Sequence, residues 1–180
     1  MPVTSTPGSI KTKIAETLAR VKKANETLKA FTAVLEGTAL AEAELADQRT
    51  NAGDTGRILH GAPIAVKDIV DVAGIVSGCG SLTQRAAAPA KRDAACVARL
   101  REAGAIIPAK THTVEFAFGG WGTNHAVGTP KNPWDRKVHR TPGGSSSGTG
   151  VAVGAGLIPA GLGTDTGGSV RLPASYCGCV

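Results

Sequence analysis

Apolar and charged positions over the first sixty residues follow the spacing of helices. Ser9 suits an N-cap, and the apolar side chains after it recur at helical spacing: Ile10, Ile14, Leu18, Val21 and Leu28. This pattern predicts an amphipathic helix over residues 9–28. The run FTAVLE (31–36) is typical of a short strand, and the Ala-, Leu- and Glu-rich residues 38–47 predict a second helix. We therefore interpret residues 1–60 as an N-terminal helical region.

From residue 61 the pattern changes to continuous β-branched and apolar runs. GAPIAVKDIVDVAG (61–74) is bounded by Gly-Ala-Pro and Ala-Gly, which predicts a buried strand. Residues 93–105 predict a helix, and IIPAKT (106–111) predicts a second buried strand. A strand, a helix and a strand at this spacing indicate a βαβ-like unit, so we expect an α/β architecture for residues 61–180.

The segment after Thr113 is rich in glycine and other small residues, which alternate with apolar residues as in tight turns joined to short buried elements. The chain stops at Val180, in what reads as the middle of an element. We therefore expect the sequence to be the N-terminal portion of a longer protein, incomplete at its C-terminus.

Composition narrows the classes of function. The net charge is +6, but the basic residues are spread along the chain and aromatic residues make up only 3%, so direct nucleic-acid binding is not expected. No apolar run approaches the roughly 18 residues of a membrane span, and we expect a cytoplasmic protein without membrane contact. Cys177 and Cys179 have no second pair or nearby histidine to complete a metal site, so no metal or cofactor is expected.

The stretch GGSSSGTG (143–150) fits several motifs, most of which fail on spacing. It lacks the lysine of a P-loop, and Gly154 falls one residue late for a dinucleotide fingerprint. It matches the G-x-S-x-G nucleophile elbow, centred on Ser146. The elbow requires a later histidine, and none of the four histidines follows His139. This alternative stays open only if a histidine lies beyond Val180.

Lys67 is a candidate general base. It is flanked by apolar residues on the predicted strand 61–74, and burial lowers the pKa of a lysine. Asp68 is adjacent, but neighbours on a strand point to opposite faces, so it need not pair with Lys67. A neutral lysine can activate a serine. The alternative is a lysine at a strand end whose ammonium reaches solvent.

Ser169 is a candidate nucleophile in GTDTGGSVRLP (163–173). The glycines before it let several backbone N–H groups converge on one point, as an oxyanion hole requires. The alternative is a Gly-Gly turn before a helix, with Ser169 as its N-cap.

These stretches together resemble the amidase signature family over Gly61 to Gly178. TPGGSSSGTGVAVGAGLIPAGLGTDTGGSVRLPASYCG resembles the defining segment of the family, and GAPIAVKDIVDVAG resembles its lysine strand. The resemblance implies the amidase-signature fold, an α/β fold with a central mixed sheet flanked by helices. It also implies a Ser–cis-Ser–Lys triad of Ser169 as nucleophile, Ser145 as bridging serine and Lys67 as base.

The resemblance assigns further roles around this triad. It implies a cis peptide before Ser145 and an oxyanion hole formed by the backbone N–H groups of Thr166, Gly167, Gly168 and Ser169. GGWG (119–122) is expected near the pocket, so Gly119, Gly120 and Trp121 are candidate substrate contacts, although a structural role for the tryptophan stays open. Asp165 and Arg171 are interpreted as a buried structural pair.

The activity implied is that of an amidase, a hydrolase of linear carbon–nitrogen bonds that releases ammonia or an amine through an acyl-enzyme. The partner would be a small-molecule amide, with a homodimer as the assembly. The alternative is the glutaminase (A) subunit of a glutamyl-tRNA(Gln)/aspartyl-tRNA(Asn) amidotransferase with its partner subunits, but such members commonly carry glutamine where Leu172 stands. A second alternative is an inactive truncated remnant. Family members are over twice this length, so we expect the 180 residues alone to be inactive.

Overall fold

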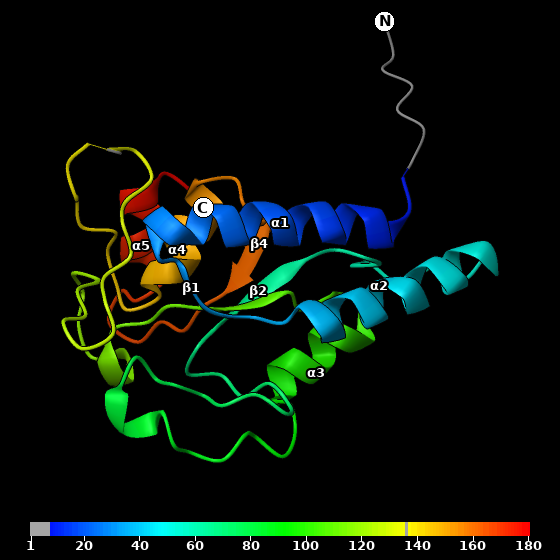
Figure 1. Cartoon of the computed structure of the whole chain (residues 1–180), viewed down its shortest axis with the longest axis horizontal. Helices are drawn as coiled ribbons and strands as arrows, with labels where there is room; N and C mark the ends of the chain where they lie inside the picture. The colour runs from blue at the N-terminus through cyan, green and yellow to red at the C-terminus, as the bar shows by residue number, and fades with distance from the viewer. Residues whose placement is uncertain (1–7, 136) are drawn as a thin grey trace, which may run out of the picture.

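A four-stranded sheet forms the centre of the protein, whose computed structural model describes residues 8–135 and 137–180 (Figure 1). The strands are β1 (Phe31–Val34), β2 (Ile64–Lys67), β3 (Ala109–Thr111) and β4 (Ala160–Leu162). Their order is β1-β3-β2-β4, with β1 antiparallel to β3 and the other pairs parallel. The sheet is therefore mixed, which confirms the predicted α/β class.

Helices surround this sheet, and two short 3₁₀ turns lie in its loops. The helices are α1 (Ile10–Leu28), α2 (Glu36–Asn51), α3 (Ala95–Glu102), α4 (Ser147–Gly154) and α5 (Arg171–Cys177), and the turns are η1 (Leu82–Gln84) and η2 (Glu115–Ala117). The Ser9 hydroxyl accepts a hydrogen bond from the Thr12 N–H, which confirms the predicted cap. No helix among the described residues is long and apolar enough to cross a membrane.

The two faces of the sheet pack against different helices, because successive side chains on a strand point in opposite directions. Ala65 of β2 lies in one apolar cluster with Val151 and Ala152 of α4. Val66, the next residue, lies in a second cluster with Val97 of α3. Lys67 is consequently directed toward α4.

The predicted strands are shorter in the structure than in the sequence pattern. Of residues 61–74 only β2 is strand, because the chain turns directly after Lys67, whose carbonyl accepts a hydrogen bond of 3.0 Å from the Val70 N–H. Of residues 106–111 only β3 is strand, since Pro108 has no N–H to donate to a ladder. The order β2-α3-β3 with parallel strands confirms the predicted βαβ unit.

The N-terminal region is not purely helical, since β1 pairs with β3 inside the same sheet. A boundary at residue 60 stays a prediction.

Glycine-rich residues 143–163 contain a helix and a strand that local propensity disfavours. A side chain at Gly148 of α4 would overlap the carbonyl oxygen of Ala30 and the N–H of His112, so only glycine permits this close approach of α4 to the sheet. The glycines thus serve close packing as well as turns.

Candidate active site

Lys67 ends β2 and is completely buried, at 0% exposure. Its Nζ lies 2.7 Å from the Oγ of Ser145 and 2.8 Å from the Oγ1 of Thr164. No carboxylate among the described residues forms an ion pair with it. The alternative of a lysine reaching into solvent is therefore wrong.

Burial sets the protonation of Lys67. Removal from water disfavours the ammonium and lowers the pKa of Lys67 to about 8, while the negative charge of Asp165 opposes this shift. With a pKa of about 8, roughly a tenth of the molecules hold a neutral Lys67 at pH 7. A neutral amine beside a hydroxyl can accept its proton.

Ser145 is held in a tight turn between the sheet and the loop 119–122. The Gly144–Ser145 peptide is cis, and the Ser145 carbonyl accepts a hydrogen bond of 3.1 Å from the Val114 N–H. A side chain on Gly144 would lie 2.8 Å from the Gly119 carbonyl oxygen, so glycine is required for this loop to pack against the turn.

Ser169 follows in the loop before α5 and lies beside the serine-rich turn. Its carbonyl accepts a hydrogen bond of 3.0 Å from the Ser146 N–H. Ser145 and Ser169 line one cavity of about 320 Å³, together with Ala117, Phe118, Gly119, Gly120, Thr164, Thr166, Gly167 and Leu172. Within residues 8–135 and 137–180 no hydrogen bond joins the two serine hydroxyls.

The backbone N–H groups before the nucleophile are not equivalent. The N–H of Gly168 donates to the Oδ1 of Asp165 at 2.7 Å. Those of Thr166, Gly167 and Ser169 have no acceptor in the described part of the chain. Three of the four predicted oxyanion donors are therefore available, and Gly168 is committed to the loop.

Asp165 and Arg171 form an ion pair of 2.8 Å, but the pair is not buried as predicted. The Arg171 side chain is 74% exposed, whereas that of Asp165 is 19% exposed. Hydrogen bonds from Arg171 and from the backbone hold the pKa of Asp165 well below its usual range. Asp165 also accepts from the first N–H groups of α5, whose N-cap is Val170, so Ser169 is not the cap.

The predicted pocket residues divide into two groups. Gly119 and Gly120 line the cavity, whereas Trp121 is 66% exposed and is not among its described lining residues. Sequence reasoning missed Phe118, which is 92% exposed at the cavity, and the lining role of Leu172. Apolar side chains thus contribute to the walls around the two serines.

Ser146 lies apart from the cavity that Ser145 and Ser169 share. Its Oγ is 3.3 Å from both the N–H and the carbonyl oxygen of Thr164, and the residue is 1% exposed. No histidine hydrogen-bonds to it among the described residues. The nucleophile elbow centred on Ser146 therefore lacks support. No group of three or more His, Cys, Asp or Glu that could hold a metal occurs in the described ranges.

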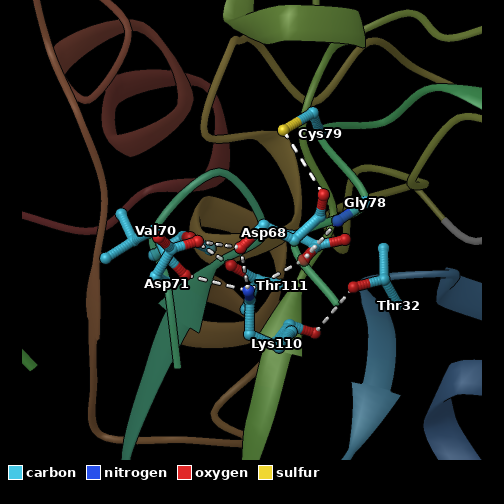
Figure 2. Close-up of polar contacts among 10 residues, drawn as sticks. Thr32, Asp68, Val70, Asp71, Gly78, Cys79, Lys110 and Thr111 are labelled. Carbon is cyan, nitrogen blue, oxygen red and sulfur yellow. Dashed lines mark hydrogen bonds and ion pairs between the residues drawn. The ribbon is translucent and has the colours of Figure 1, made fainter. Parts of the chain in front are cut away.

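Two polar features near the site were not predicted. Thr164 supplies the second hydroxyl beside Lys67. A second buried lysine, Lys110, lies on β3 and pairs with Asp68 at 3.0 Å, as Figure 2 shows. The run IIPAKT carries the same signal as the strand of Lys67, a lysine after apolar residues, and could have marked Lys110.

Comparisons with known proteins agree with this arrangement. A Rhodopirellula baltica protein, named as the A chain of glutamyl-tRNA(Gln) amidotransferase, is 45% identical over 92% of this chain and 32% of its own length. A Mycobacterium bovis protein that carries the amidase name AmiA2 is also 45% identical, over 91% of this chain and 33% of its own. The chain thus spans about a third of these curated relatives.

A solved structure extends the likeness to the fold. It comes from a vestigial protein complex described as revealing the evolutionary origins of an s-triazine catabolic enzyme. It superposes with a TM-score of 0.91 at 39% identity, covering 95% of this chain and 37% of that chain. The family model described as Amidase matches residues 13–180. The chain therefore belongs to the amidase family.

Proposed function

We propose that the protein hydrolyses a linear amide through a Ser169–Ser145–Lys67 triad and an acyl-enzyme. The observation that carries this proposal is the 2.7 Å contact between the buried Lys67 Nζ and the Ser145 Oγ. Ser145 shares its cavity with Ser169, so a proton can pass from the nucleophile to the base within one enclosed site.

The first chemical step is attack on the amide carbonyl. Neutral Lys67 takes the proton of Ser145, Ser145 takes that of Ser169, and the Ser169 oxygen bonds to the carbonyl carbon. The Ser169 hydroxyl turns toward Ser145 when the substrate binds, since catalytic hydrogen bonds often tighten only in the substrate complex. The N–H groups of Thr166, Gly167 and Ser169 then stabilise the oxyanion.

The second step frees the amine and restores the enzyme. The proton on Lys67 returns through Ser145 to the leaving nitrogen, the carbon–nitrogen bond breaks, and ammonia or an amine departs. Water then attacks the acyl-enzyme, its proton follows the same route, and the acid product leaves with Ser169 re-protonated.

Leu172 bears on the choice between a free hydrolase and a glutaminase component of an amidotransferase. Its apolar side chain lines the cavity beside Ser169, where it cannot donate a hydrogen bond to a polar substrate such as glutamine. This favours an amidase for small amides. The glutaminase component is the second candidate, because the Rhodopirellula baltica relative bears an amidotransferase name. Glutamine hydrolysis that depends on added amidotransferase partner subunits would identify the second candidate.

The proposal is tested with the complete protein and a panel of small amides. Lys67→Ala, Ser145→Ala and Ser169→Ala are each expected to abolish ammonia release. Ser175→Ala, on an exposed turn of α5, is the matched serine control and keeps activity. Near wild-type turnover by Lys67→Ala at neutral pH would show that the triad is wrong. Inactivity of residues 1–180 alone and the homodimer stay predictions.

A further inference from the structure

Asp68 follows Lys67 directly, yet the two side chains are not paired. A carboxylate within a few ångströms of an ammonium favours the charged form and would raise the pKa of a lysine. Asp68 is buried, so its charge has to be held by some other group. What holds Asp68 therefore affects whether Lys67 can be neutral.

The register of β2 and β3 places the two lysines on opposite faces of the sheet. Lys67 lies opposite Thr111, and Val66 lies opposite Lys110. Paired residues on neighbouring strands point to the same face, and alternation puts Asp68 on the face of Val66. Thr111 marks the other face, since its hydroxyl lies 2.6 Å from that of Thr149 in α4.

Lys110 is the group that holds Asp68. Its Nζ lies 3.0 Å from the Asp68 Oδ1 and donates to the Val70 carbonyl at 2.9 Å and to the Ser77 hydroxyl at 3.3 Å (Figure 2). The Gly78 N–H donates to the same carboxylate at 3.2 Å. Lys110 is 0% exposed, so the pair is formed away from solvent.

The other charged groups near Lys67 are also engaged. Asp165, in the loop after β4, accepts from Arg171 and from three backbone N–H groups. Asp71 lies on the Lys110 side of the sheet and accepts from the Ser77 hydroxyl at 2.7 Å. The sequence of α4, SGTGVAVG, has no charged residue.

We propose that Lys110 is a positioning residue that holds the Asp68 carboxylate on the face of the sheet away from Lys67. Lys67 then keeps two hydroxyl groups, and no carboxylate, as its hydrogen-bond partners. This inference rests on the proposed function of Lys67 as a base, but it concerns a separate ion pair on the other face.

The test is an NMR titration of the Lys67 side chain in the complete protein labelled with ¹³C and ¹⁵N lysine. The Lys67 signal is assigned by its loss in Lys67→Met. Lys110→Met leaves Asp68 uncompensated and is expected to raise the titration midpoint of Lys67 by about one pH unit. Asp68→Asn leaves Lys110 uncompensated and is expected to lower it by about as much. The double variant returns the midpoint to the wild-type value.

The double variant decides whether Asp68 mediates the effect. If it keeps the shift of Lys110→Met, or if the single variants shift in the same direction, the inference is wrong. Asp68→Asn keeps the Val70 and Ser77 partners of Lys110, so it provides a test even if Lys110→Met does not fold. Lys22→Met, from an exposed pair with Glu36, is the matched control and is expected to shift nothing.

The titration needs no substrate and no activity. A failed amide assay with the expected midpoints would overturn the proposed function alone. Loss of activity in the triad variants with unchanged midpoints in Lys110→Met and Asp68→Asn would overturn this inference alone.

Discussion

Lys67 and Lys110 are two fully buried lysines on neighbouring strands, and their surroundings differ in kind. Lys67 contacts two hydroxyl groups, whereas Lys110 contacts a carboxylate, a carbonyl and a hydroxyl. Burial is common to both, so burial alone does not make a base. The partner decides whether a buried lysine is a structural cation or a group that can be neutral near physiological pH.

The largest expected difference between the two lysines is in activity. Lys67→Met is expected to lower kcat/KM by about 10³-fold or more, since it removes the group that takes the proton from the serines. Lys110→Met is expected to retain most activity at pH 9, where a large share of Lys67 is neutral even with a raised pKa. Amide turnover at pH 9 measures both, and an equal loss in the two variants would erase the distinction.

Stability is expected to separate the lysines in the opposite sense. Lys110→Met leaves the buried Asp68 carboxylate without its cation, which costs about 3–5 kcal/mol of unfolding free energy. Lys67→Met removes a buried cation that has no ion-pair partner and is expected to be neutral or stabilising at pH 7. Urea unfolding at pH 7 measures this. A greater loss of stability in Lys67→Met would contradict it.

The pH dependence sharpens the comparison further. Activity is expected to rise about tenfold between pH 7 and pH 9, because Lys67, with a pKa of about 8, loses its proton in that range. Its pKa is lower folded than its ordinary value of 10.5, so between about 8 and 10.5 the unfolded state binds more protons and stability rises with pH. Lys67→Met should lack this rise. A flat profile of activity across pH 8 would argue against a lysine base.

A smaller effect is expected from the second hydroxyl at Lys67. Thr164→Val keeps the shape of the side chain but removes one hydrogen bond of 2.8 Å, which corresponds to about a fivefold loss in kcat/KM. Val170→Thr, on an exposed position nearby, is a control for changes in the loop. Full activity in Thr164→Val would mean that Ser145 alone orients Lys67.

The smallest effect is expected at the exposed pair beside the nucleophile. Arg171→Gln removes a side chain that is 74% exposed, so it should change the unfolding free energy by less than about 1 kcal/mol. Asp165→Ala should cost more, because its carboxylate also caps the first turn of α5. Thermal unfolding compares the two, and an equal loss would show that the ion pair matters more than the cap.

The contrast between the lysines also shows what sequence alone can establish. Both lysines follow apolar runs, so the pattern predicts that each ends a buried strand. Their partners come from distant parts of the chain: Thr164 lies 97 residues from Lys67, and Ser145 lies 78. Local patterns do not encode such contacts. The triad came from the resemblance to a family, whereas Lys110 matched no motif and was overlooked.

Secondary structure shows the same limit. The amphipathic helix α1 was predicted to within one residue, because one apolar face dictates its period. Helix α4 was not predicted, since its glycines disfavour a helix locally and are there to permit contact with the sheet.

Labelling with a fluorophosphonate that reacts with activated serines tests the role of Lys67 most directly. The rate is followed from pH 6 to pH 10 in wild type and Lys67→Met, and the modified residue is mapped by mass spectrometry. We predict modification of Ser169, a rate that reaches half its maximum near pH 8, and a loss of about 10³-fold in Lys67→Met. Modification of Ser146, or an unchanged rate in Lys67→Met, would contradict the account.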